Sequence, residues 1–378
     1  MKKRWMSGIL LTLLLSLLAG CGQAGGTQDK KLNEQGTGTM ELQYATEFSV
    51  DYYEDGYKLI SIVDGGRFLV VPEGKGVPEE FGAEDVVPLY QPIENAYLAA
   101  TAAMDFFVKL DSMDSLSMSG MEQEDWHIDA PAAAMEEGKL VFSGKYKAPD
   151  YEMMTEKSCS LAIESTMIDR VPEVKEKLNE LGIPVLVDHS SKEPHPLGRV
   201  EWIKLYGALV NEEQKAEEVF AKQEEIFKGM DNSGTQDTSV VFFYLNSEGV
   251  PCAPQPDDYM SQIIALAGGK YVFAGPDAPE RDLNTTKMEM ETFFAAAKDA
   301  ECIIYNSTMY GELESINEML EKSELLREMK AVKSGNVWCT RESMFQSTTD
   351  LGVMMESFRQ VFSGEADGLD EVPYMYRL

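Results

Sequence analysis

Positive charge is scarce in this chain of 378 residues, because 33 Lys and Arg stand against 65 Asp and Glu and give a formal net charge of −32. Proteins that neutralise nucleic-acid phosphates, or that dock on anionic lipid through a basic patch, need the opposite excess. We therefore expect no nucleic-acid partner, and any attachment to a membrane must use another means.

Histidine and cysteine are sparse as well, with three His and five Cys and no C-x-x-C spacing. A zinc or manganese importer would offer several His plus an acid from both lobes of its site, and the C-terminal part of this chain, residues 231–378, has no His. We predict no metal site formed by the protein itself. The four cysteines beyond residue 150 are predicted to be buried thiols rather than a disulfide framework: Cys159, Cys252, Cys302 and Cys339.

Enzyme motifs are missing too. The sequence has no Gly-x-Ser-x-Gly elbow, no Walker loop, no His-Glu-x-x-His and no Gly-x-Gly-x-x-Gly after a strand. Ser165 follows a strand, but only His189 offers a base for it. We expect a protein that is not an enzyme, with no catalytic residue and no cofactor.

At 44% hydrophobic and 26% charged residues, the chain is globular and long enough for two domains.

The first 39 residues are predicted to be a targeting segment followed by a tether. Lys2, Lys3 and Arg4 precede an apolar run of ten residues, Ile9–Leu18, which is too short for the roughly 20 residues that span a bilayer. We assign a signal peptide to residues 1–20. Leu18-Ala19-Gly20-Cys21 resembles the bacterial lipobox, which implies lipidation of Cys21. Residues 21–39 are predicted to be a flexible, lipid-anchored tether, so the protein is expected on the extracytoplasmic face of the cell membrane, held by lipid alone. A plain secretory peptide with a chance cysteine is the alternative.

Strands and helices then alternate along the chain. A β-rich opening is predicted at 57–63 and 67–71, followed by short apolar strands separated by helices, which is typical of a parallel sheet covered on both faces. The predicted strands are 86–90, 115–118, 139–142, 160–163 and 184–188, and the predicted helices are 94–107 and 171–181. These elements form a first α/β lobe over residues 40–210.

A linking helix and a second α/β lobe are predicted to follow. The pattern is helical from residue 196, and Asn211 with Gln214 marks the start of a helix over residues 211–230 that Gly229 closes. The second lobe, residues 231–378, is predicted to contain strands 239–244, 270–273, 302–305 and 336–339 and helices 258–267, 289–298, 314–329 and 352–362. The predicted fold class is α/β, with two Rossmann-like lobes joined by one long rigid helix and a ligand cleft between them.

Six stretches carry a resemblance to a known family: Leu161–Ile168, Leu181–Asp188, the linking helix ending near Met230, Ile264–Gly269, Ala300–Asn306 and Met329–Trp338. They resemble, in order, the substrate-binding lipoproteins of bacterial ABC importers for iron-siderophores, haem and corrinoids, whose two lobes are bridged by one helix. The resemblance implies a monomer that carries a small-molecule metal chelate, most simply an iron-siderophore or haem, to a permease dimer with its ATPase. A corrinoid (cobalamin) carrier and a ligand-sensing or adhesion surface module are the alternatives. The β-rich opening departs from the family, and Pro88–Glu94 replaces its usual first strand and helix start.

In open α/β sheets the ligand lies beyond the carboxyl ends of the strands. Aromatic residues there suit a bulky ligand, and Arg grips carboxylates. The predicted ligand-binding residues of the first lobe and linker are Tyr90, Gln91, Trp126, Tyr146, Ser165, Thr166, His189, Arg199 and Trp202. Those of the second lobe are Tyr244, Asn246, Tyr259, Arg281, Tyr305, Asn306, Arg341, Phe345 and Gln346.

Several of these residues have a structural alternative. His195 is equally well explained as the cap of a helix beginning at Leu197, and His189 as a loop residue, rather than as groups touching a chelated metal. Arg199 has the alternative of an ion pair with Glu193 or Glu201. In the family that the chain resembles, one surface Glu on each lobe meets Arg residues of the permease, and the matching positions are Glu152 and Glu291, with Glu289 as a close competitor.

Overall fold

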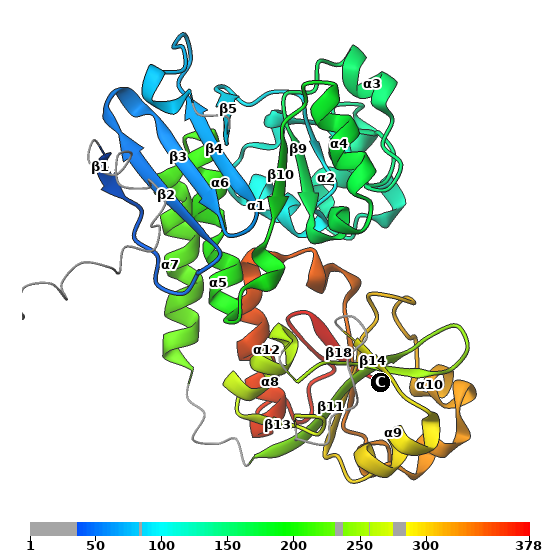
Figure 1. Cartoon of the computed structure of the whole chain (residues 1–378). Coiled ribbons are helices and arrows are strands. Elements are labelled where there is room, and N and C mark those ends of the chain that lie inside the picture. The colour runs from blue at the N-terminus through cyan, green and yellow to red at the C-terminus, as the bar shows by residue number, and fades with distance from the viewer. Residues whose placement is uncertain (1–35, 83–84, 231–236, 257, 275–284) are drawn as a thin grey trace, which may run out of the picture. The chain divides into compact units, whose positions relative to one another are not determined.

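The computed structural model describes residues 36–82, 85–230, 237–256, 258–274 and 285–378. The predicted signal peptide and most of the tether, Cys21 included, lie outside the described residues. Thr37–Leu378 forms one compact unit, whose described part contains three sheets (Figure 1). No helix in this described part is long and apolar enough to cross a membrane.

The first sheet is the β-rich opening that the sequence predicts. Its strands lie in the order β1-β2-β3-β4-β5, with β2, β3 and β4 antiparallel and β5 parallel to β4. They span β1 Gly36–Thr39, β2 Phe48–Tyr53, β3 Lys58–Ile62, β4 Gly66–Val71 and β5 Val86–Tyr90. Alternate residues of β2 and β3 enter the main core, and the ring of Phe48 meets that of Trp202 at 5.0 Å.

The second sheet is fully parallel, in the order β10-β9-β6-β7-β8. Its strands are β6 Ala96–Leu98, β7 Leu116–Ser119, β8 Val141–Phe142, β9 Ala162–Ser165 and β10 Val185–Asp188. The connecting helices are α1 Met104–Lys109, α2 Asp129–Glu136, α3 Tyr151–Glu156 and α4 Pro172–Glu180. Both sheets lie in the first lobe, and Figure 1 shows the opening sheet in blue beside the parallel one.

Two expectations for this lobe are wrong. Residues 94–107 were expected to form a helix, but Ala96–Leu98 is the central strand β6 and the helix begins only at Met104. A short, fully buried apolar run fits a strand as well as a helix, so periodicity could not separate the two. The first strand of the parallel sheet is therefore present, and is not replaced by Pro88–Glu94. Residues 86–90 do form a strand, but it completes the opening sheet.

Helices α5 Pro196–Glu201, α6 Ile203–Val210 and α7 Glu213–Gly229 follow the parallel sheet. Asn211, with φ 64°, ends α6 in the left-handed conformation. A Cβ at Gly207 would lie 2.7 Å from that of Ala216, so glycine is what lets α6 and α7 pack closely. Helix α7, which occupies the place of the predicted linking helix, packs on α6 and on α12 (Leu351–Ser363) of the second lobe.

The second lobe has an eight-stranded sheet in the order β14-β12-β11-β15-β16-β18-β17, with β13 beside β11. Its strands are β11 Thr238–Leu245, β12 Pro251–Pro254, β13 Gly269–Tyr271, β14 Thr285–Lys287, β15 Cys302–Tyr305, β16 Val337–Thr340, β17 Glu371–Val372 and β18 Met375–Arg377. Its helices are α8 Tyr259–Leu266, α9 Met290–Ala297, α10 Ile316–Lys322, α11 Lys330–Ser334 and α12 Leu351–Ser363. The four parallel strands were predicted from sequence, whereas the antiparallel ones were not.

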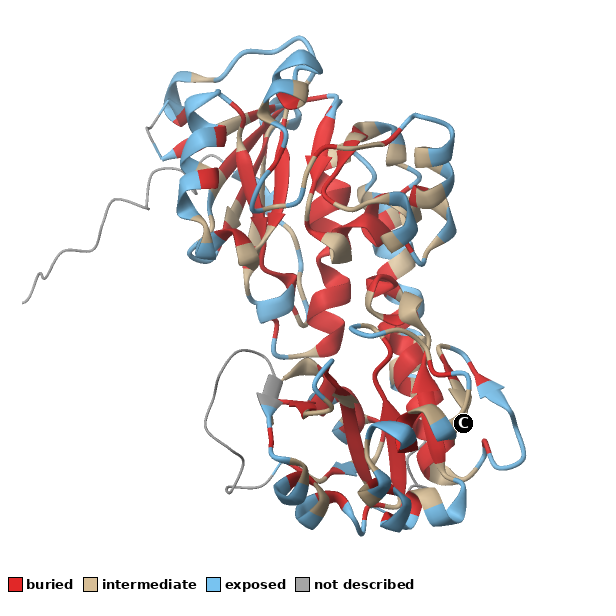
Figure 2. Ribbon diagram, turned by 90° about the vertical axis from the view of Figure 1, so that its right-hand side faces the viewer, coloured by how far each residue is buried: buried red, intermediate tan, exposed pale blue. Residues whose placement is uncertain are grey.

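Buried residues concentrate in the strands and in the helices between them (Figure 2). The four described cysteines are free and buried, as the sequence predicts. Burial raises the pKa of the Cys159 thiol to about 11, and it also raises the pKa values of Cys252, Cys302 and Cys339. All four are therefore protonated, unreactive thiols at neutral pH.

Candidate functional site

The carboxyl ends of β6, β7, β9 and β10 reach one edge of the parallel sheet, because all these strands run the same way. Ser165, the last residue of β9, and Thr166, which follows it, are two of the predicted ligand-binding residues; both lie at this edge and are half-buried. The Ser165 hydroxyl accepts a hydrogen bond from the Met167 amide at 3.4 Å and so caps the next turn. We call this edge, facing the second lobe, the ligand edge.

Gln346 joins the two lobes beside the ligand edge. Its side-chain oxygen accepts from the His127 amide and its nitrogen donates to the Asp125 carbonyl, both at 2.8 Å. His127 Nδ1 also lies 3.3 Å from a carboxylate oxygen of Glu342. Gln346, a predicted ligand-binding residue, therefore bridges the lobes. Trp126, next to it, is buried with an indole nitrogen that has no hydrogen-bond partner in the described part.

A second bridge between the lobes uses residues that are not among the predicted ligand-binding set. Asp105 of α1 accepts hydrogen bonds from the amide and the hydroxyl of Thr349 at 2.8 and 2.5 Å. The hydroxyl of Thr348 donates to the Ala102 carbonyl at 3.0 Å. Burial raises the pKa of Asp105, while the two bonds from Thr349 act in the opposite direction. The signal for this bridge in the sequence is Asp105 itself, an acid that follows the strand Ala96–Leu98. It can be recognised only once that segment is assigned as a strand.

Arg199 of α5 is the most unusual charged residue at this junction. Its side chain is 8% exposed, and its guanidinium lies 3.9 Å from the ring centre of Tyr259, which begins α8 in the second lobe. The expected alternative, an ion pair with Glu193 or Glu201, is wrong, because those carboxylates bind backbone amides of residues 43–47. Arg199 Nε has no hydrogen-bond partner, and no acid pairs with this guanidinium among the described residues.

The second lobe carries two further pairs of neighbouring aromatic side chains. Phe345 lies 6.3 Å from Tyr259, ring centre to ring centre, and Tyr244 lies 5.7 Å from Tyr310. Tyr310 and its neighbour Met309 follow β15 and are 45% and 61% exposed. Neither was among the predicted residues, although both lie just beyond the end of a predicted strand. An exposed Tyr next to an exposed Met is a wall suited to a bulky, partly apolar ligand.

Other predicted residues lie in structural positions. Trp202 and Tyr305 are completely buried in the core, and Trp202 donates to Glu193 at 2.8 Å. Tyr90 and Gln91 end the opening sheet, and Gln91 donates to the Leu209 carbonyl at 2.8 Å. We leave these four out of the proposed site.

The remaining predicted residues are local or already paired. Asn246 and Asn306 bind amides of their own turns through their side-chain oxygens, and Arg341 is paired with Glu312 and Glu371 at 2.9 and 3.1 Å. Tyr146 is half-buried in a turn beyond β8. Arg281 lies outside the described residues.

The two histidines near α5 have structural roles. His195 Nδ1 accepts from the Leu197 amide at 3.1 Å, so it caps α5 as the alternative interpretation proposed. His189 is 2% exposed and lies against the turn of the opening sheet at Gly65. Burial lowers the pKa values of both. In the described ranges no three His, Cys, Asp or Glu side chains are arranged to hold a metal ion.

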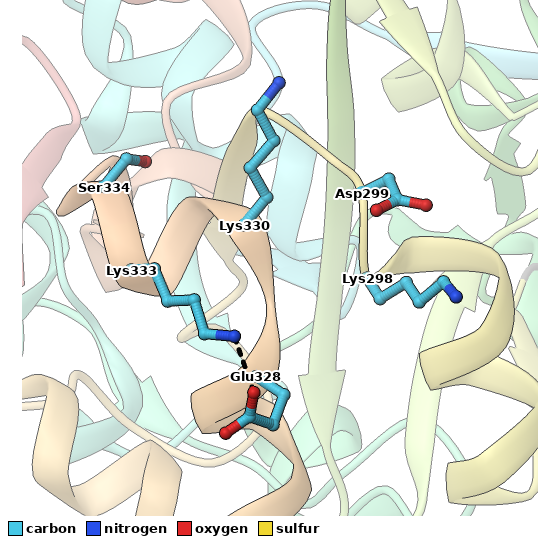
Figure 3. A pocket seen from close by; sticks show the side chains of 6 residues that line it. All are labelled: Lys298, Asp299, Glu328, Lys330, Lys333 and Ser334. Carbon is cyan, nitrogen blue, oxygen red and sulfur yellow. Dashed lines mark hydrogen bonds and ion pairs between the residues drawn. The ribbon is translucent and has the colours of Figure 1, made fainter.

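A pocket of about 490 Å³ lies away from this junction, on the second lobe, and is shown in Figure 3. It is lined by Lys298, Asp299, Glu328, Lys330, Lys333 and Ser334. Lys333 pairs with Glu328 at 2.6 Å and Lys330 pairs with Glu301 at 2.9 Å. Exposed, paired lysines are an ordinary solvated surface, so the ligand edge remains the better candidate.

A family model described as periplasmic binding protein matches residues 120–343, which is more than half of the chain. The chain belongs to the periplasmic binding protein family. This is a family of binding proteins and not of enzymes, which confirms that expectation and the suspected resemblance. An uncharacterised lipoprotein of Methanocaldococcus jannaschii is 24% identical over 402 residues, which cover all of both chains.

Solved structures share the fold of this periplasmic binding protein. A haem-binding periplasmic protein of Pseudomonas aeruginosa has a TM-score of 0.58 at 14% identity, covering 75% of this chain and 97% of that one. The petrobactin-binding protein of Bacillus subtilis (0.56, 14%, 71% and 92%) and the vitamin B12-binding protein of Vibrio cholerae (0.54, 17%, 73% and 99%) are also similar. The predicted two-lobed α/β fold class is thus confirmed.

Proposed function

We propose that this chain is the extracytoplasmic, lipid-anchored binding component of an ABC importer that captures a metal chelate, most simply an iron-siderophore or haem. The names of the similar solved structures support this class of cargo. The full-length similarity to a lipoprotein supports the anchor. In this proposal the binding protein works as a monomer and delivers cargo to a permease dimer coupled to its ATPase.

One observation carries the proposal. Arg199 is a buried cation without an acid partner among the described residues, placed where Tyr259 and Phe345 of the second lobe meet the first. A buried charge is costly unless it is paired. An anionic arm of the cargo, such as a carboxylate, would supply the missing partner, while Tyr244, Met309 and Tyr310 would cover its apolar body. The metal would arrive already chelated.

The direct test is mass spectrometry of cargo that co-purifies with the full-length chain in mild detergent. A thermal-shift screen complements it, because a ligand at a hundredfold excess over Kd stabilises the folded state by about 2.7 kcal/mol. Ferric siderophores or haem are expected to raise the melting midpoint. Stabilisation by simple sugars or amino acids, with no response to any metal chelate, would contradict the proposal.

A corrinoid is the second candidate cargo. It is favoured by the similarity to a solved vitamin B12-binding protein. Adding cobalamin to the thermal-shift screen separates the two candidates. If the cargo is a corrinoid, cobalamin should raise the melting midpoint and the iron chelates should not.

Lipid attachment gives the first mutational prediction. Cys21→Ser removes the thiol that the lipobox-like sequence offers for acylation. We expect the protein to move from the membrane fraction to the soluble extracytoplasmic fraction, because the tether has no basic patch or apolar span to hold it. Cell fractionation measures this, with Cys159→Ser as the control that stays on the membrane. A Cys21→Ser protein that remains membrane-bound would refute the anchor.

Docking to the permease gives the second mutational prediction. Glu152 in α3 of the first lobe and Glu291 in α9 of the second are both exposed and lie in the first turns of their helices. Glu152→Arg combined with Glu291→Arg should reduce uptake in cells that depend on this system and leave cargo affinity unchanged, because rim charges act on association.

The matched control for docking is Glu176→Arg with Glu321→Arg, which makes the same charge change at exposed positions on α4 and α10. Its uptake should stay near that of the unmodified protein. Normal uptake by the Glu152 and Glu291 variant would remove both residues from the docking surface.

A further inference from the structure

Glu164 is a buried acid that the proposed function does not use. It lies in β9, is 0% exposed, and neither carboxyl oxygen has a hydrogen-bond partner in the part of the chain that the structure describes. Its strand register places it opposite Val187 of β10, and the neighbouring residues of β9 and β10 belong to a small apolar cluster. An unpartnered carboxyl in such a site strongly disfavours its charged form.

The groups facing Glu164 do not offset this effect. Tyr97 of β6 and Tyr151 of α3 are the hydroxyls close enough to interact with it, and the Cys159 thiol lies in the same cluster. The Tyr97 hydroxyl donates to the Gly144 carbonyl at 2.8 Å instead. Lys177 and Glu173 of α4 lie close enough to act on Tyr151, but among the described residues no charged group offsets the burial of Glu164. Burial alone raises the pKa of Glu164 to about 8.

The position of Glu164 connects two surfaces of the first lobe. The next residue, Ser165, caps the turn Thr166–Arg170 at the ligand edge. On the other side, the cluster around Glu164 includes Tyr151 and Met154 of α3, the helix that carries Glu152. The cluster around Glu164 therefore adjoins both the ligand edge and α3.

We propose that Glu164 is a proton-linked switch beneath the ligand edge: with its proton bound the carboxyl stays in the apolar cluster, and loss of the proton drives it towards water and loosens the end of β9 together with α3. The consequence for cargo rests on the proposed function, whereas the proton binding does not.

The sign of the pH dependence follows from the raised pKa. Between the ordinary Glu value of 4.5 and about 8, the folded protein holds a proton at Glu164 that the unfolded chain has lost. The contribution of Glu164 to stability is therefore unaffected below about pH 4.5, falls as the pH rises through this window, and is most unfavourable above about pH 8.

The experiment compares wild type, Glu164→Gln and the exposed control Glu152→Gln in urea unfolding of the full-length chain from pH 5 to 9. Relative to Glu164→Gln, the wild type and Glu152→Gln should show an unfolding midpoint in urea that falls steadily as the pH rises, because only these two proteins keep the carboxyl of Glu164. Amide exchange should also speed up between pH 7 and 9 at the end of β9 and in α3 of the wild type, and not in Glu164→Gln. Parallel pH profiles for all three proteins would overturn the switch.

A measurement on the wild type keeps the test independent of how the variant folds. Infrared difference spectroscopy should show a protonated carboxyl band at pH 7 that disappears by pH 9. A spectrum without this band at pH 7 overturns the proposal, whatever cargo the protein proves to bind.

Discussion

Replacing Arg199 by methionine is expected to weaken cargo binding by about two orders of magnitude without destabilising the fold. Truncating one partner of a buried, hydrogen-bonded charge pair costs about 2–5 kcal/mol, and each 1.4 kcal/mol is a factor of ten in Kd. The free protein loses nothing comparable, because Arg199 has no acid partner in the described residues and methionine keeps the apolar contact with Tyr259. Removing an unpaired buried charge should leave stability unchanged or raised.

The test measures bound cargo per protein and the unfolding midpoint on the same samples. Arg359→Met is the matched control, since Arg359 is equally buried but pairs with Glu356 and Glu365 at 2.7 and 2.6 Å. That control should lose stability and keep cargo affinity. Unchanged cargo binding by Arg199→Met would show that the unpaired guanidinium is not the cargo-binding group.

Glu201→Gln is expected to be the most destabilising single substitution among those discussed. The Glu201 carboxylate is completely buried and accepts hydrogen bonds from the amides of Gln43, Tyr44 and Ala45 at 2.8–3.0 Å. It also pairs with the ammonium of Lys204 at 3.2 Å. Breaking a buried charge network of this kind costs roughly 3–5 kcal/mol, a large part of the 5–15 kcal/mol by which domains are stable.

Glu217→Gln is the control for this prediction, because Glu217 also pairs with Lys204, at 2.8 Å, but is 57% exposed. Exposed pairs contribute about 0–1 kcal/mol. Urea unfolding should therefore separate the two variants by several kcal/mol. If the two proteins unfold at the same urea concentration, the carboxylate of Glu201 does not hold the segment at residues 43–45.

The sequence was sufficient for the two lobes because their strands are short, apolar and separated by amphipathic helices. Prediction from sequence failed where the hydrophobic residues of an element show no distinctive period. Ala96–Leu98 has only three residues, all buried, and these cannot show whether the repeat is two or 3.6; only its pairing with β7 and β9 identifies it as a strand. The antiparallel strands β12, β14, β17 and β18 have two to four residues each, too few for a pattern.

The candidate site was predictable only in outline. The rule that ligands lie at the carboxyl ends of strands selects Ser165, Tyr244 and Phe345 as candidates, since it depends on chain direction alone. It could not tell that Trp202 and Tyr305 turn inward, because side-chain direction depends on packing. The same rule could not show which carboxylates already accept hydrogen bonds from other parts of the chain. Only the structure reveals that Glu193 and Glu201 are bound to backbone amides, which leaves Arg199 without an acid partner among the residues that it describes.

The buried, protonated thiols have a practical consequence for studying movement between the lobes. Cys159, Cys252, Cys302 and Cys339 are all inaccessible, and a thiol reacts only as an exposed thiolate. A single cysteine placed on the surface, for example at Glu176 or Glu321, would be the reactive one in the folded body. Pairs of such positions could carry spin labels or fluorophores in an otherwise native chain, so the distance between the lobes could be followed with and without cargo.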